Sequence, residues 1–166
     1  MRPMGRLYAV FFEVKRNGPK GRADYLAEAR ALSARVAAMS GFLDVERFEN
    51  KTRPGWLLSL SKWRDESSLL AWREVFEHRV TQEKGRHGMF KDYRIRVARQ
   101  VENGGEFTLL DSRSPRVGTG EIQAFVSLTE ANHVVALVES PNLTGGSHWQ
   151  IVRDYGMHDR HQAPHD

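Results

Sequence analysis

The fold of this chain is decided by residues 63–72, which read Trp63-Arg64-Asp65-Glu66-Ser67-Ser68-Leu69-Leu70-Ala71-Trp72. Asp65 stands at the start of a helix, where a carboxylate accepts a hydrogen bond from an unpaired backbone amide and opposes the helix dipole. Apolar residues then recur at helical spacing, and the buried stripe consists of Leu69, Trp72, Phe76 and Val80. The pattern predicts a strand that ends at Trp63 and an amphipathic helix that runs on to about Lys84.

The residues around this helix predict four strands and a second helix. The predicted elements are, in order, a strand at 8–14, a helix at 22–39, strands at 42–49 and 56–63, the helix after Asp65, and a strand at 93–98. The first strand alternates at period two, and both of its faces are apolar as far as Glu13. Ser40 and Gly41 end the first helix in the usual way.

This order of elements is the ferredoxin-like split β-α-β unit of the α+β class, an antiparallel four-stranded sheet with both helices on one face. Two helices cover one side of the sheet, yet the first strand is apolar on its other side as well. We therefore expect a homodimer, in which the sheet of a second copy packs there and closes a dimeric α/β barrel. Phe11, Trp56 or Trp63 should lie in that interface.

The composition limits the class of protein. The 166 residues, 40% of them hydrophobic, suffice for one core and an appendage. No cysteine is present, which excludes disulfides, thiolate metal sites and a cysteine nucleophile. The apolar run from Leu7 to Phe12 is too short for a signal peptide core or a membrane span, so we expect a cytoplasmic protein that makes no membrane contact.

The net charge of +4 hides a basic segment, which contains Lys84, Arg86, His87, Lys91, Arg94, Arg96 and Arg99. A nucleic-acid surface would also need interleaved, exposed aromatic residues or a known binding motif. We therefore interpret this segment as a solvated edge and expect no nucleic-acid partner.

The helix and the last strand also carry a family pattern. After Trp63 and Trp72 come His78, Gly85-Arg86, and a final segment with Phe90, Tyr93, Ile95 and Val97. That order resembles the second half of the antibiotic biosynthesis monooxygenase (ABM) family. The resemblance covers residues 6–101 and implies the dimeric α/β barrel, an oxidation with O₂, and a pocket between the second helix and the sheet.

Residues 102–166 lie outside the family pattern. Four more strands are predicted there, at 107–110, 122–128, 133–139 and 148–154. Residues 56–61 and 133–138 look faintly alike, which is compatible with a second copy of the unit without its helices. A C-terminal β-hairpin extension at 102–156, lying over the pocket or a sheet edge, is the favoured interpretation. Residues 157–166 are expected to form a loose tail.

Trp72 and His78 are the candidate catalytic residues. The resemblance implies that Trp72 lines the cavity, and ordinary helix packing explains this tryptophan equally well. His78 flanks the apolar stripe and suits a general base, because imidazole titrates near neutral pH; a boundary histidine paired with Glu74 is the alternative. The candidate substrate-binding residues are Phe12, Trp56, Phe76, Gln82 and Arg86.

One branch of the ABM family oxidises polycyclic phenols with O₂ and neither flavin nor metal. We therefore interpret the chain as a cofactor-independent monooxygenase for a small aromatic phenol or quinol. Heme binding or degradation is an alternative. The heme-degrading members use an asparagine on the first strand and a histidine about ten positions beyond the tryptophan, whereas residues 8–14 contain no asparagine and Gln82 stands at that tenth position. A non-catalytic ligand-binding or stress-related dimer is the third possibility.

No metal site is expected from the sequence. The histidines near its end are His148, His158, His161 and His165. A metal site needs rigid ligands with supporting neighbours, and a tail that contains Gly, Pro and Asp does not supply them.

Overall fold

In a computed structural model of the chain, the described residues are 7–16, 27, 35–75, 90–102, 104–112, 122–128, 130, 133–139 and 146–156. They form eight strands: β1 (Tyr8–Arg16), β2 (Phe42–Asn50), β3 (Trp56–Trp63), β4 (Phe90–Val101), β5 (Phe107–Ser112), β6 (Ile122–Ser127), β7 (Val134–Val138) and β8 (Ser147–Gly156). Every predicted strand is confirmed, with ends that differ by a few residues.

Helical residues are described at 27, 35–37 and 66–75. They confirm the end of the first predicted helix and the start of the second, and the remainder of both predictions lies outside the described residues. Among the residues that the structure describes, no helix has both the length and the apolar character needed to cross a membrane.

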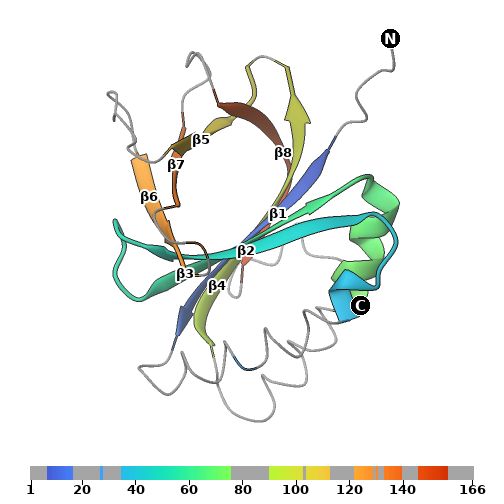
Figure 1. Cartoon of the computed structure of the whole chain (residues 1–166), viewed down its shortest axis with the longest axis horizontal. Coiled ribbons are helices and arrows are strands. Elements are labelled where there is room, and N and C mark those ends of the chain that lie inside the picture. The colour runs from blue at the N-terminus through green and yellow to red at the C-terminus, as the bar shows by residue number, and fades with distance from the viewer. Residues whose placement is uncertain are drawn as a thin grey trace.

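The eight strands form one closed barrel in the order β1-β3-β2-β6-β7-β5-β8-β4. All neighbouring strands are antiparallel. Figure 1 shows the strands as a ring with the described helical turns outside it. The barrel is therefore closed within a single chain.

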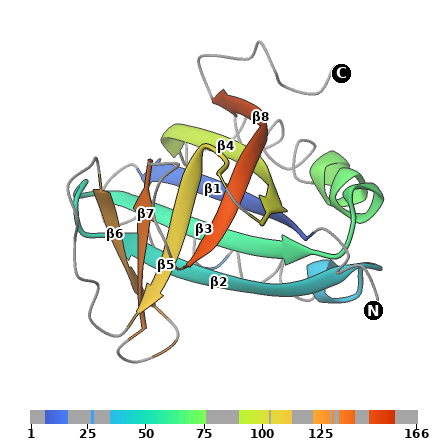
Figure 2. The ribbon, with the colours of Figure 1, turned by 90° about the horizontal axis from the view of Figure 1, so that it is seen from above.

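The barrel consists of two four-stranded halves with the same internal order. The first half runs β4-β1-β3-β2 and the second runs β8-β5-β7-β6, so each strand of the second half takes the place that its counterpart takes in the first. In Figure 2, the strands of the second half lie side by side. The halves meet at two seams, where β2 pairs with β6 and β4 pairs with β8. This strand order supports the interpretation of the C-terminal strands as a second copy of the four-stranded unit. The favoured prediction of a hairpin lying over the domain is corrected, because these strands complete the barrel.

The inner face of the barrel holds an apolar core to which both halves contribute. Its buried members are Ala9, Phe11, Phe48, Leu58, Leu60, Ala98, Phe107, Leu109, Phe125, Val135, Leu137 and Trp149. Phe11 contacts two aromatic rings of the second half edge-on, with centroid distances of 5.0 Å to Phe107 and 6.1 Å to Trp149. The second apolar face of β1 is thus covered by the same chain. The prediction that the sheet of a second copy buries this face is wrong, because strands of the same chain cover it. The homodimer itself stays a prediction.

The outer face of the first half, together with Tyr155 of β8, carries a separate core beneath the helices. Its buried members are Val10, Phe12, Val14, Val36, Leu57, Trp63, Leu69, Tyr93, Ile95, Val97 and Tyr155. Val36 and Leu69 come from the two helical segments. Trp63, which was expected in a dimer interface, lies in this core instead.

The start of the second helix confirms the role predicted for Asp65. One carboxylate oxygen of Asp65 accepts hydrogen bonds from the backbone amide of Ser68 at 2.9 Å and from its hydroxyl at 2.8 Å. These bonds hold the pKa of Asp65 below its usual value. Gly41 lies against this turn with φ +81°, and a Cβ there would approach Ser68 Oγ to 1.9 Å and Ser68 Cβ to 2.5 Å, so a larger residue would be strained at this position.

Candidate functional site

An aromatic layer lies between the sheet and the helix at residues 66–75, and we define it as Phe12, Phe42, Trp63, Trp72 and Tyr93. The rings of Trp63 and Trp72 are 6.2 Å apart, those of Phe42 and Trp63 5.4 Å, and those of Phe12 and Tyr93 6.0 Å. The two tryptophans meet because the helix begins directly after β3, at the Asp65 cap. Such a layer suits contact with a planar or apolar ligand.

Within the aromatic layer, the side chain of Trp63 is fully buried and hydrogen-bonded, whereas that of Trp72 is partly exposed to solvent. The indole of Trp63 is fully buried, and its Nε1 donates a hydrogen bond to Ser61 Oγ at 3.0 Å. Trp72 is partly buried and packs against the same core. The layer therefore has a rigid base on the sheet and a partly exposed ring on the helix.

The structure brings two of the predicted site residues together on this face and places a third elsewhere. Phe12 and Trp72 both belong to the outer core. Trp56 precedes Leu58 by two residues on β3, so its side chain lies on the inner side of the sheet with Leu58. It packs beneath the guanidinium of Arg53, 4.2 Å from the ring centroid. Phe12 and Trp56 therefore lie on opposite faces of the sheet.

The other four site residues that the sequence predicted are Phe76, His78, Gln82 and Arg86, and they lie outside the described residues. Their roles remain predictions from the sequence.

A buried ion pair lies inside the barrel, and the sequence interpretation missed it. Arg96 Nη2 is 3.1 Å from Glu13 Oε2, and both side chains are only 2% exposed. Arg96 Nη1 also lies 3.9 Å from Glu139 Oε1, at the end of β7. The prediction of a solvated edge is therefore wrong for Arg96. The sequence contains one indication of this position. Arg96 alternates with Ile95 and Val97 along the strand, so its side chain lies on the face of β4 opposite to these apolar residues.

A second pair fastens the seam between β4 and β8. Arg94 donates two hydrogen bonds to Asp154, from Nε to Oδ1 at 2.9 Å and from Nη2 to Oδ2 at 2.6 Å. These bonds lower the pKa of Asp154 and raise the pKa of Arg94 from their ordinary values. This bidentate geometry defines the relative position of β4 and β8 more closely than a single ion-pair contact does.

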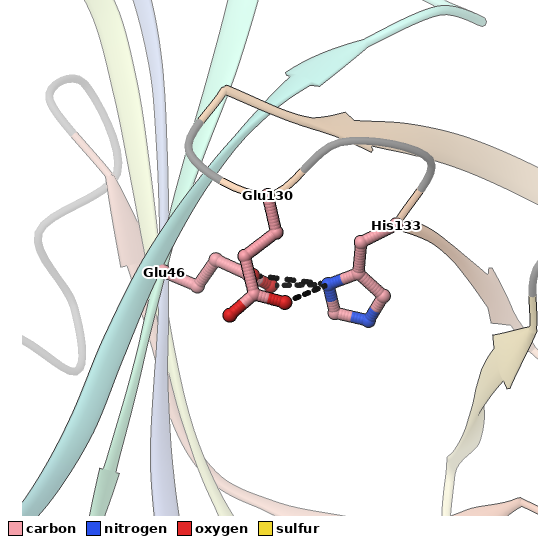
Figure 3. A group of neighbouring side chains, drawn as sticks. All are labelled: Glu46, Glu130 and His133. Carbon is pink, nitrogen blue, oxygen red and sulfur yellow. Dashed lines mark hydrogen bonds and ion pairs between the residues drawn. The ribbon is translucent and has the colours of Figure 1, made fainter.

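The other seam carries a mixed cluster of Glu46, Glu130 and His133, which we call the Glu–Glu–His cluster (Figure 3). His133 Nδ1 lies 2.7 Å from Glu46 Oε2 and 3.8 Å from Glu130 Oε2. The imidazole also packs on Phe48, with ring centroids 5.7 Å apart. Glu46 and His133 are 87 positions apart, so no local sequence pattern groups them. Carboxylate and imidazole groups in this arrangement are able to bind a metal ion.

Comparisons with known proteins identify the family. The family model for antibiotic biosynthesis monooxygenase matches residues 10–84, from β1 into the second helix. The uncharacterized protein YqjZ of Bacillus subtilis is 32% identical over 93 residues, which cover 55% of this chain and 77% of that relative. The chain belongs to the ABM family. This result confirms the resemblance drawn from Trp63 and Trp72, and the matched segment contains both.

A second relative of this ABM protein carries a functional name. A jasmonate monooxygenase ABM from Pyricularia oryzae is 45% identical over 91 residues, which cover 55% of this chain. The matched part is 42% of the length of that relative, so this chain corresponds to less than half of it.

Proposed function

We infer that the protein is a monooxygenase whose small, largely apolar substrate binds against the aromatic layer. The supporting observation is the contact between Trp63 and Trp72, which lies within the segment that matches the ABM family. The name of the Pyricularia relative supports a monooxygenase reaction. The partly exposed face of Trp72 provides a surface on which a flat or apolar molecule can pack.

The proposed reaction transfers one oxygen atom of O₂ to the substrate, and the second oxygen atom leaves as water. A polycyclic phenol of the anthrone type supplies all four electrons itself when its CH₂ group becomes C=O. Hydroxylation of a C–H bond supplies two electrons, and two more must come from an external reductant. We propose the phenol or quinol reaction, without a cofactor, as the first substrate class, and a jasmonate-like carboxylate as the second.

The proposed residue roles combine the aromatic layer with predictions from the sequence. Trp72 and Phe76 form the wall of the pocket, and His78 at its mouth takes the phenolic proton. Gln82 or Arg86 polarises the carbonyl group that develops. Removal of the proton makes the substrate electron-rich enough to react with O₂.

Turnover of a substrate panel tests the function. Purified protein is incubated under ¹⁸O₂ with anthrones, naphthols and jasmonate, each with and without NADPH, while oxygen uptake and product mass are measured. We expect one ¹⁸O atom in the product of a phenolic substrate without NADPH. Saturable binding without turnover of any substrate would identify a ligand-binding protein instead. A Soret band that forms on titration with hemin would favour the heme alternative.

Two variants test the site. We expect Trp72→Phe to raise KM several-fold with little change in kcat, because the fit to the substrate loosens. Removal of a general base lowers kcat by about 10²-fold or more, and we expect this of His78→Ala. Trp149→Phe, in the inner core, and His148→Ala, on β8, are the matched controls. Wild-type kinetics in both site variants would contradict the assignment.

The homodimer and the cytoplasmic location stay predictions. Because the strands of the second half cover the inner face of the first, any dimer must use another surface. Light scattering at micromolar concentration measures the assembly, and a monomer would contradict the predicted homodimer.

A further inference from the structure

The Glu–Glu–His cluster carries more negative charge than the described residues around it neutralise. Glu46 and Glu130 both approach His133, and no lysine or arginine of the described residues forms an ion pair with either carboxylate. A single imidazole supplies at most one positive charge against two carboxylates. The cluster is therefore electrostatically suited to a cation.

The three side chains come from both halves of the barrel. Glu46 lies on β2, and Glu130 and His133 lie in the connection between β6 and β7, next to the seam where β2 pairs with β6. The side chains of Glu46 and His133 are 18% and 23% exposed, whereas that of Glu130 is 70% exposed. Two ligands are thus held in partly buried positions, and the third faces solvent, from which an ion can enter.

The connection between β6 and β7 is shaped by its own hydrogen bonds. Ser127 donates its backbone amide to the His133 carbonyl at 2.9 Å, and the Glu130 amide donates to Ser127 Oγ at 3.0 Å. The His133 amide donates in turn to the Glu130 carbonyl at 3.4 Å. These bonds fix the backbones of both ligand residues, which lowers the entropy lost when a ligand atom is held by an ion.

We propose that the Glu–Glu–His cluster binds a divalent first-row transition metal ion, with one imidazole nitrogen and two carboxylate oxygens as protein ligands. The candidate ligand atoms all lie within 4.8 Å of one another. Zn–N and Zn–O bonds of about 2.1 Å in a tetrahedral site place neighbouring ligand atoms about 3.4 Å apart. The present distances from His133 Nδ1, 2.7 Å to Glu46 and 3.8 Å to Glu130, lie on either side of that value. Small side-chain movements therefore complete the site.

The ligand chemistry indicates which ions fit. Imidazole suits zinc, iron and nickel, whereas carboxylate oxygen suits harder ions such as manganese. A set with one nitrogen and two oxygens accommodates Zn²⁺ and Mn²⁺, and three protein ligands leave a coordination position for water. Because the ligands come from both halves, the bound ion fastens the seam between β2 and β6. This role is independent of the proposed oxygenase reaction.

Zinc binding and thermal unfolding test the proposal. All proteins carry His158→Ala, His161→Ala and His165→Ala, which remove the histidines of the C-terminal tail as competing ligands. Titration with Zn²⁺ at pH 7.5 should show one saturable site. An ion that binds only the folded chain at a concentration of 100 times Kd should raise Tm by about 5 °C or more.

Variants of the cluster decide between a metal site and a simple ion pair. Glu46→Gln and Glu130→Gln should each weaken Zn²⁺ binding by at least about tenfold. The matched control is Glu49→Gln, on the same strand, where Glu49 pairs with Lys51 at 3.6 Å, and this change should leave the affinity unaltered. If Glu46→Gln does not fold, the affinity of Glu130→Gln for Zn²⁺ tests the proposal alone. Glu130 is largely exposed, so its replacement should not impair folding. Absence of saturable binding in the parent protein, or equal weakening by Glu49→Gln, would overturn the proposal.

Discussion

Neutralising Glu13 tests how the interior of the barrel tolerates charge. In a Glu13→Gln variant, the guanidinium of Arg96 loses the carboxylate that lies 3.1 Å away. Two acidic neighbours remain among the described residues: Glu139 is 3.9 Å away with a side chain that is 54% exposed, and Asp154 is hydrogen-bonded to Arg94, so they replace only part of the lost interaction. The variant therefore leaves a positive charge in the interior without an equivalent partner.

The expected cost follows from the burial of the pair. Both side chains are 2% exposed, so solvent does not screen their interaction. Removing one partner of a buried pair costs about 3–5 kcal/mol, and the contact to Glu139 places our expectation at about 3 kcal/mol. For a chain of this length that corresponds to a fall in Tm of roughly 6–12 °C.

The paired replacement Glu13→Leu with Arg96→Met should restore most of this stability. Glu13 Oε1 and Arg96 Nε are buried without a hydrogen-bond partner, so the native pair is imperfectly satisfied. Replacing both residues by apolar ones removes the desolvation cost together with the attraction. We expect the double variant to lie within about 1 kcal/mol of the parent protein.

Urea unfolding followed by tryptophan fluorescence measures these differences, since the chain contains four tryptophans. Glu102→Gln, an exposed change next to β4, is the control and should stay within about 0.5 kcal/mol of the parent. A Glu13→Gln variant as stable as the control would refute the reasoning. A double variant no more stable than Glu13→Gln would refute it as well.

Two further predictions concern the β4–β8 seam and the loop before β5. Asp154→Asn should cost about 1 kcal/mol at pH 7, because the bonded pair with Arg94 is partly exposed. Since the folded pKa of Asp154 is lowered, its contribution to stability is present above about pH 4 and disappears as the pH falls through the folded pKa. The urea curves of parent and variant should therefore approach each other as the pH is lowered from about 4, and a difference that stays constant would contradict this. Gly105→Ala should cost more than Gly55→Ala in the same assay. Both glycines have positive φ, but only at Gly105 would a Cβ approach a backbone atom, the Trp149 carbonyl oxygen at 2.6 Å; equal costs would refute the role of that contact.

The strands and the helix cap were predictable because their signals are local. Short apolar or alternating runs bounded by turn residues identified all eight strands, and the Asp65 cap followed from its position at the start of the helical stripe. Closure of the barrel depends on pairing between segments far apart, such as Phe48 with Ser127. No local sequence pattern indicates which distant strands pair. For this reason the sequence predicted that a second molecule, and not the C-terminal strands, covers the second face of β1.

The candidate site was predictable to a smaller extent. Helical spacing and the cap correctly placed Trp72 on the side of the helix that faces the outer core, whereas its role in a site stays a prediction. The grouping of Phe12 with Trp56 failed because a strand has two faces, and a list of aromatic residues does not record which face each one occupies. Glu46 and His133 meet only when the two halves are joined.

Closure within one chain changes how this barrel forms and how it can vary. A barrel built from two molecules assembles in a second-order step and comes apart on dilution, whereas here the halves are held at a fixed effective concentration by the backbone between β4 and β5. A symmetric pair of chains also carries every substitution twice. In this barrel each substitution occurs once, so the half that bears the helices can keep Trp63 and Trp72 while the other half diverges.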